Sequence, residues 1–248
     1  DVAVINMTNE KQLNQTLNAL NNDPSVISID VDQKVNLLES VTMSSVVATA
    51  VNAYNQWNYT ALQLQQFHAH TNGDGILVAV IDSGVNRTGT DLNGLNQVLD
   101  GCDWVTSPTN VCRETGVDDE NGHGTHVAGS IGGSTTGVAK AVSIVPVRAL
   151  DSCGRGTTTM VLNGLNWILA DHQLGQKAVV NMSIGFESTA TSVETAIKSL
   201  LSEGIVVVAA SGNDGKSSCG ITPAGTEGTI SVAASMSNDG EPSFTNFG

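Results

Sequence analysis

The stretch Val78-Ala79-Val80-Ile81-Asp82-Ser83-Gly84 decides how this chain folds. Its first four residues are apolar without alternation, which is typical of a strand that is buried on both faces of a sheet. The strand delivers the carboxylate of Asp82 into a Ser-Gly turn. Because ligands of open α/β folds bind at the carboxyl edge of the strands, we expect Asp82 to lie at a functional edge.

Beyond this strand, apolar runs alternate with helical patterns. Strands are expected at 76–81, 97–104, 143–150, 178–183, 205–211 and 229–235, and helices at 123–132, 157–171 and 190–203. Near-continuous apolar strands separated by helices predict an α/β fold with a mostly parallel central sheet and helices on both faces. A chain of 248 residues is long enough to bury a large core.

A second segment, Asn121-Gly122-His123-Gly124-Thr125-His126-Val127-Ala128-Gly129, places a histidine between two glycines at the start of a helix of small residues. The glycines allow backbone and substrate to approach closely. His123 is therefore a candidate general base, and Asp82 would hold its imidazole in one tautomer. Taken alone, Asp82 could be a turn-capping residue and His123 a structural histidine. His126 is assigned no catalytic role.

A third segment, Ala209-Ala210-Ser211-Gly212-Asn213, ends an apolar strand in a turn. The side-chain amide of Asn213 could donate a hydrogen bond to a developing oxyanion. A plain turn residue is the alternative, since Asn213-Asp214-Gly215 also has good turn chemistry.

In this order the three segments resemble the Asp, His and oxyanion-hole Asn segments of subtilisin-like serine proteases, the subtilase or peptidase S8 family. The resemblance covers residues 57–248 and implies a subtilisin-like fold and a serine endopeptidase, with Asp82, His123 and Asn213 in the catalytic machinery. The Gly-Thr-Ser-Met-Ala stretch that carries the nucleophile in that family is absent from this sequence. We therefore expect a domain truncated before the nucleophile, and a chain that is inactive alone.

Two further segments resemble the edges of the family's substrate cleft, which bind polypeptide substrates by adding a strand. The residues that the resemblance assigns to these edges are Gly154, Arg155, Gly156, Ser183, Ile184 and Gly185. Arg155 would favour acidic substrate side chains. The short connection 132–140 resembles the proteinase K-like branch, which lacks a longer calcium-binding loop. We expect no cofactor and no metal site, although calcium could bind to a complete protein.

Residues 1–38 resemble the C-terminal half of the inhibitory propeptide of subtilisins. The pattern predicts a strand at 2–8, a helix at 9–21 and an alternating strand at 26–32. The resemblance implies that this segment acts as an intramolecular inhibitor. The uncharged stretch that follows predicts a linker at 39–56 containing the maturation site.

The composition restricts the partners and the compartment. A net charge of −14 disfavours nucleic acid and anionic membranes, and no apolar run approaches the roughly 20 residues of a membrane span. The acidic cluster 118–120 is expected to be a solvated loop rather than a metal site. We expect a monomer, with any targeting segment removed or upstream.

Four cysteines and four sequons favour secretion. Cys102 and Cys112 bracket a loop and are expected to pair, which leaves Cys153 and Cys219 to pair across the fold. Free buried thiols are the alternative, and zinc is disfavoured because no C-x-x-C pair is present. The candidate glycosylation sites are Asn6, Asn14, Asn58 and Asn86.

Two alternatives to a truncated serine endopeptidase stay open. The chain could be a non-catalytic binding or scaffold protein with a subtilisin fold, or one half of a split protease whose nucleophile lies on another chain. The absence of the serine favours both alternatives, whereas the joint presence of Asp82, His123 and Asn213 argues against a degenerate site.

Overall fold

The structure of the chain is a computed structural model. It describes residues 3–7, 9–38, 56–88, 91–92, 97–106, 112–114, 117–186 and 188–248. Most of the linker predicted at 39–56 lies outside the described residues.

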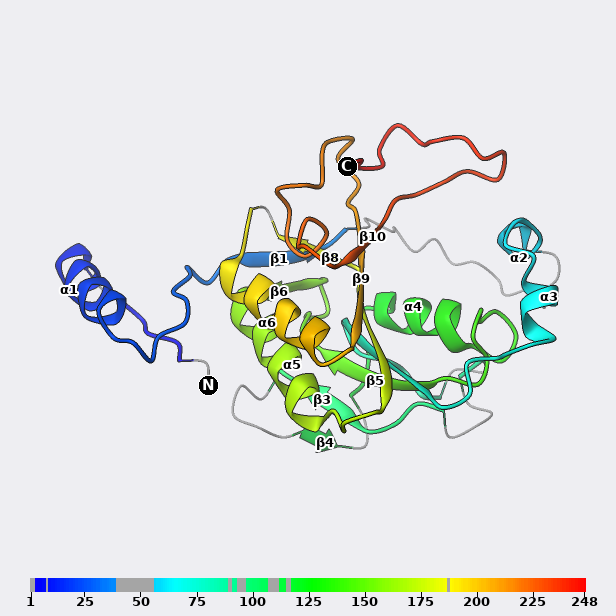
Figure 1. Cartoon of the computed structure of the whole chain (residues 1–248), viewed down its shortest axis with the longest axis horizontal. Helices are drawn as coiled ribbons and strands as arrows, with labels where there is room; N and C mark the ends of the chain where they lie inside the picture. The colour runs from blue at the N-terminus through cyan, green and yellow to red at the C-terminus, as the bar shows by residue number, and fades with distance from the viewer. Residues whose placement is uncertain are drawn as a thin grey trace.

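A seven-stranded sheet forms the centre of the molecule (Figure 1). In spatial order its strands are β10 (Ile230–Val232), β9 (Val206–Ala210), β7 (Lys177–Met182), β2 (Ile76–Asp82), β5 (Ser143–Arg148), β3 (Gly101–Asp103) and β4 (Cys112–Glu114). All neighbouring pairs are parallel except β3 and β4, which form an antiparallel pair at one edge. The predicted α/β fold with a mostly parallel sheet is confirmed.

Helices cover both faces of this sheet (Figure 1). On one face, α4 (His123–Gly132) buries Ala128 against Val78 and Val80 of β2. On the other face, α5 (Thr158–Asp171) and α6 (Thr191–Ser202) pack in the cluster that contains Ala79 and Ile81 of the same strand. Successive side chains of a strand point to opposite faces, so a strand covered on both sides must be apolar throughout.

A second, smaller sheet joins the N-terminal region to the body of the molecule. Its central strand, β1 (Lys34–Leu37), pairs antiparallel with β6 (Arg155–Thr157) on one side and β8 (Ile184–Phe186) on the other. Hydrophobic periodicity predicts none of these three strands, which are three or four residues long; the family resemblance indicated β6 and β8 as strand-pairing edges, but not β1. Their pairing brings residues more than 100 positions apart into contact.

The N-terminal region differs in part from its prediction. The expected helix forms as α1 (Glu10–Asn21), with the Asn9 side chain accepting from the Gln12 amide at 3.0 Å, and it stands away from the body (Figure 1). The strand predicted at 26–32 is wrong: Ile27 and Val31 are 85% and 81% exposed, and no described strand pairs with this segment. The described part of 2–8 also forms no strand.

The strand predicted at 97–104 is shorter than expected, with β3 at Gly101–Asp103 and one isolated bridge from Val98 to Ile144. Two short helices, α2 (Trp57–Ala61) and α3 (Leu64–His68), precede the first strand of the large sheet. Among the described residues, no helix combines the length and hydropathy needed to cross a bilayer.

The loop 134–136 is anchored by Asp91. The carboxylate accepts hydrogen bonds from the backbone N–H groups of Thr135 and Thr136 and from the hydroxyls of Ser134 and Thr136. Burial by itself would raise the pKa of Asp91, but these hydrogen bonds stabilise the charged form and lower the pKa to about 2.

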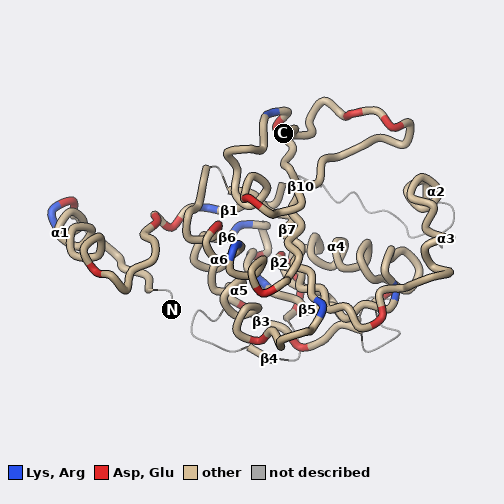
Figure 2. The backbone as a smooth tube through the Cα atoms, in the orientation of Figure 1, with Lys and Arg blue, Asp and Glu red and all other residues tan. Residues whose placement is uncertain are grey.

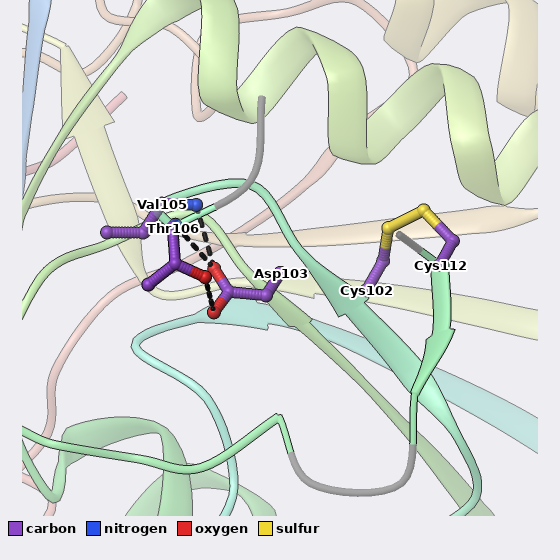
Figure 3. Close-up of a disulfide and its surroundings, with 5 residues drawn as sticks. All are labelled: Cys102, Asp103, Val105, Thr106 and Cys112. Atoms are coloured by element: carbon purple, nitrogen blue, oxygen red, sulfur yellow. Dashed lines mark hydrogen bonds between the residues drawn. A yellow bond between two sulfur atoms is a disulfide. The ribbon is translucent and has the colours of Figure 1, made fainter. Parts of the chain in front are cut away.

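The cysteines pair in one of the two predicted ways. Figure 3 shows the disulfide from Cys102 to Cys112 across the β3–β4 hairpin, beside the turn in which Asp103 accepts from the backbone N–H groups of Val105 and Thr106 at 2.8 and 3.1 Å.

The predicted pairing of Cys153 with Cys219 is wrong for this structure, where both are exposed thiols. Strand β1 lies between β6, which follows Cys153, and β8, which is hydrogen-bonded through Phe186 to the loop that contains Cys219. Strands two positions apart in a sheet are roughly 9–10 Å apart, whereas disulfide Cα atoms lie within about 7 Å.

Candidate active site

The end of β2 and the start of α4 bring Asp82 and His123 together. The imidazole Nδ1 lies 2.8 Å from Oδ1 and 2.9 Å from Oδ2 of the carboxylate, with the Asp82 side chain fully buried and that of His123 9% exposed. The Ser83 backbone N–H donates to Oδ1 at 2.7 Å and fixes the carboxylate. A carboxylate facing Nδ1 favours the tautomer in which Nε2 can accept a proton.

This contact depends on the close approach of α4 to the end of β2. A Cβ atom added at Gly124 would lie 2.1 Å from the carbonyl oxygen of Gly84 and 3.2 Å from the Asp82 carboxylate. Any side chain at this position would push the helix away. The glycine after His123 is therefore a geometric requirement of the pair.

Asp119 holds the loop that precedes His123, a role that the sequence analysis missed. Its carboxylate accepts five hydrogen bonds, from Ser83 Oγ, the backbone N–H groups of Asn121, Gly122 and Thr125, and Thr125 Oγ1. Burial alone would raise the pKa of Asp119, but these hydrogen bonds lower it below its ordinary value. The expectation of a merely solvated acidic loop is wrong for this residue.

Ser83 completes the link between the two candidate catalytic segments. Its hydroxyl donates to Asp119 at 2.8 Å and accepts from the backbone N–H of Gly124 at 3.0 Å. The residue after Asp82 is thereby bonded to the residue after His123. Glu120 is also engaged, through an ion pair of 2.7 Å with the buried Arg148 on β5.

Asn213 lies in the turn after β9 and is half-buried. Its side-chain Nδ2 donates a hydrogen bond to the carbonyl oxygen of Leu38, the residue that follows β1. An amide that binds a main-chain carbonyl at the end of an added strand is placed as an oxyanion-hole donor would be. Asp82 thus ends β2, Asn213 follows the end of β9, and His123 begins α4 beside the end of β2.

The predicted substrate-binding residues flank β1. Val35 lies opposite Gly156 and Phe186, Asn36 opposite Arg155 and Gly185, and Leu37 opposite Ile184. The Leu37 backbone N–H also donates to the Gly154 carbonyl at 3.0 Å. Ser183 directly precedes β8. The segment 34–37 is thus held between the two predicted edges as an added antiparallel strand.

Glycines let β1 approach the two edges. A Cβ added at Gly154 would lie 2.5 Å from Leu37 Cδ1, and one added at Gly185 would lie 2.6 Å from Leu38 Cδ2. Between these edges Val35 is completely buried and belongs to the main apolar cluster of the body. The cleft therefore holds an apolar side chain three residues before Leu38.

Acidic residues between α1 and β1, drawn red in Figure 2, attach this segment to two helices of the body. Asp32 accepts from the backbone N–H of Thr159 in the first turn of α5 at 2.9 Å, and Asp30 accepts from that of Ser192 in the first turn of α6. Ala190, at the N-cap of α6, has no side-chain acceptor of its own. Carboxylates at helix N-termini are stabilised by the unpaired N–H groups and by the helix dipole.

A cavity of about 520 Å³ opens beside His123. Its lining residues are His123, His126, Val127, Ser130, Ile131, Val138, Ala139, Asn181, Ser183 and Ala210. Two serine hydroxyls line it, and both are engaged elsewhere: Ser130 Oγ donates to the His126 carbonyl, and Ser183 Oγ accepts from Asn181 Nδ2.

The candidate glycosylation residues differ in exposure. Asn6, Asn14 and Asn86 are exposed, and Asn58 is partly buried at the start of α2. Their modification stays a prediction.

The fold, the buried carboxylate–imidazole pair and the cleft between β6 and β8 define a subtilisin-like α/β protein. The model of the subtilase family, peptidase S8, matches residues 73–248. The chain belongs to this family.

Named relatives agree with this assignment. An extracellular serine proteinase of Thermus sp. (strain Rt41A) is 35% identical over 94% of this chain and 53% of its own length. Alkaline serine exoprotease A of Vibrio alginolyticus is 32% identical over 94% of this chain and 42% of its own length. The chain thus spans about half the length of the curated relatives it matches.

A solved structure is similar as well. The crystal structure of a cold-adapted subtilisin-like serine proteinase superposes with a TM-score of 0.65 at 36% identity, covering 72% of this chain and 62% of the other.

Proposed function

We propose that the protein to which this chain belongs is a serine endopeptidase that cleaves polypeptides. The observation that carries the proposal is the placement of β1 between β6 and β8, with the Leu38 carbonyl on the amide of Asn213. Asp82 orients His123, His123 takes a proton from the nucleophile and returns it to the leaving amine, and Asn213 stabilises the oxyanion. The nucleophile is a serine of the family's Gly-Thr-Ser-Met-Ala stretch, which this sequence does not contain.

We propose further that residues 1–38 act as an intramolecular inhibitor. They fill the cleft as a strand and add the two carboxylate contacts to α5 and α6. The maturation bond then lies directly after Leu38, because its carbonyl is the one bound by Asn213. This position is at the border of the linker predicted at 39–56.

The bound strand also supports a substrate preference. Substrates would carry an apolar residue where Val35 is buried and leucine before the scissile bond, as the chain itself does. The predicted preference of Arg155 for acidic side chains stays a proposal, and its exposed side chain forms an ion pair of 3.6 Å with Asp151.

Further expectations belong to the same proposal. Secretion is supported by the extracellular name of a relative and by the Cys102–Cys112 disulfide. The short connection 132–140 supports the proteinase K-like branch. A monomer, an absence of cofactors, and calcium binding only by a complete protein stay expectations.

The test is peptide hydrolysis by the full-length protein. A p-nitroanilide of the sequence Val-Asn-Leu-Leu is the substrate, and H123A and D82N should each lower kcat by about 10⁴ or more. N213A should lower kcat by about 10²–10³. H172A is the matched control, because this partly exposed histidine caps the C-terminus of α5, at the far end of that helix from β6, and its loss should leave activity unchanged.

The isolated chain of residues 1–248 should not hydrolyse this peptide. If the full-length protein binds the peptide without cleaving it, a binding or scaffold function replaces the protease. If H123A cleaves as fast as the unsubstituted protein, the roles given to His123 and Asp82 are wrong.

A further inference from the structure

Asn213 can serve as a donor only if its backbone is held in place. It lies in a loop that leaves β9 through Gly212, whose φ of +108° is a left-handed conformation that favours glycine. The polar backbone groups around Asn213 do not belong to any helix or strand. Their hydrogen-bond partners therefore decide how firmly the oxyanion donor is fixed.

A single buried side chain, Asn246, supplies several of these partners. Its Nδ2 donates to the carbonyl of Ser211 at 2.9 Å. Its Oδ1 accepts from the backbone N–H of Asp214 at 2.9 Å and from that of Lys216 at 3.1 Å. The amide thus binds the loop on both sides of Asn213, two residues before it and one residue after it.

The backbone of Asn246 adds a fourth contact, because its N–H donates to the Gly212 carbonyl at 2.9 Å. Asn246 is 0% exposed. A Cβ atom added at Gly212 would lie 2.3 Å from Nδ2, so the amide is packed directly against the turn. Loop and amide are therefore complementary in shape as well as in hydrogen bonding.

The segment that carries Asn246 is itself anchored. The Thr245 hydroxyl accepts from the backbone N–H of Ala234, two residues after β10, at 2.8 Å. The Phe244 carbonyl adds a further contact to the loop itself, because it accepts from the backbone N–H of Gly215 at 2.8 Å. A support that is fixed to the body of the protein can transmit its rigidity to the loop.

We propose that Asn246 is a positioning residue for catalysis, which acts by holding Asn213 in the orientation that binds the oxyanion. The inference rests on the proposed function, because it takes Asn213 as the donor. An asparagine suits this position because its amide donates at one end and accepts twice at the other. Preorganised donors stabilise the transition state without having to reorient during the reaction.

The first test measures kcat and KM of the full-length protein. N246A should lower kcat by about 10² and change KM less than about threefold, because the lost support affects a contact that strengthens in the transition state. In an N213A background the same substitution should change kcat less than about threefold, since the donor it positions is already gone. N238A is the matched control: this exposed asparagine accepts only a local hydrogen bond from Gly240.

N246D separates positioning from folding. It keeps both acceptor contacts but sets a carboxylate against the Ser211 carbonyl, and a proton on that carboxylate restores the donor. The ratio of its kcat to that of the unsubstituted protein should therefore rise as the pH falls. Because the same proton also relieves any destabilisation by the buried carboxylate, the ratio is compared only over the pH range in which melting curves show both proteins fully folded. If N246A does not fold, this profile of N246D is the test.

The second test needs no nucleophile and uses the chain of residues 1–248. N246A and N213A should each raise the hydrogen-exchange rate of the Leu37 amide, and the double variant should match the single ones. A failure of the proposed function would abolish hydrolysis and leave this result unchanged. Two results would overturn the role of Asn246. One is that N246A and N213A change kcat and the Leu37 exchange rate by independent factors that multiply in the double variant. The other is that the kcat ratio of N246D does not change with pH.

Discussion

Val35→Ala should loosen the hold of the cleft on β1 by about 2 kcal/mol. The valine side chain is completely buried between β6 and β8 and packs into the main apolar cluster. Removing two carbons costs about 0.8 kcal/mol each in lost transfer free energy, and the cavity left behind adds to this cost. A change of about 2 kcal/mol corresponds to a roughly 30-fold higher population of the open cleft.

Hydrogen exchange of the intact chain measures this population directly. The Leu37 amide donates to the Gly154 carbonyl only while β1 is in place, so its exchange rate reports the opening equilibrium when closing is fast. V31A is the matched control, since it is the same substitution in the same segment at a side chain that is 81% exposed. Surface substitutions stay within about 0.5 kcal/mol, so V31A should change the rate about twofold at most.

Two results would refute this reasoning. Equal acceleration by V31A and V35A would mean that the buried valine does not hold the strand. Equal acceleration in β1 and in the central strand β2 would mean that the substitution destabilises the whole domain instead of opening the cleft. In either case the proposed preference for an apolar substrate residue at this position would lose its support.

Three further predictions concern carboxylates. D30N and D32N should each raise the exchange rate of β1 amides about threefold to tenfold, less at high salt, since each removes a charge from a helix N-terminus of the body. D119N should lower kcat of the full-length protein with little change in KM, because the loop before His123 loses its acceptor. A loss of kcat that follows the loss of folded protein at every pH would contradict a positioning role. Asp91 has a folded pKa of about 2, so its contribution to stability is present above about pH 4 and is lost as the pH falls towards 2. D91N should therefore lower the melting temperature at pH 7 and flatten its decline below pH 4, as scanning calorimetry would show.

The large sheet could be predicted because each of its long strands carries its own signal. The apolar runs at β2, β5, β7 and β9 are continuous since both faces are covered, and each was found within two residues of its ends. The short strands β1, β6 and β8 carry no such signal. They are stabilised by partners more than 100 residues away. β6 and β8 also contain glycines, which allow a close approach because a Cβ atom there would clash with neighbouring atoms.

The alternating segment 26–32 shows the opposite error. Its pattern is that of a half-buried strand, but alternation identifies a strand only when an edge is available to pair with it. Here Asp30 and Asp32 bind helix N-termini, and the pairing begins two residues later. Tertiary contacts of two carboxylates outweigh the local preference.

The site divides in the same way. Asp82, His123 and Asn213 belong to short motifs whose residue types indicate the candidate chemical role of each side chain. Asp119 and Asn246 bind backbone N–H and carbonyl groups, which nearly every residue has, so no sequence motif predicts their contacts. An aspartate four residues before a glycine-flanked histidine is the one signal that could have indicated the former. Predicting the latter would require knowing that the segment near residue 246 lies beside the turn after β9.

The N-terminal segment makes two kinds of contact with the body of the protein, and only one of them would be available to a short peptide substrate. The backbone ladder of β1 and the burial of Val35 would be available to any extended peptide with a suitable side chain. The carboxylates of Asp30 and Asp32 lie outside that strand and contact α5 and α6, which a short peptide does not reach. The proposed inhibitor would thus share its strand contacts with substrates and exceed them by the helix contacts. Removing the two carboxylates should therefore weaken inhibition by the segment while leaving the KM for the tetrapeptide substrate unchanged.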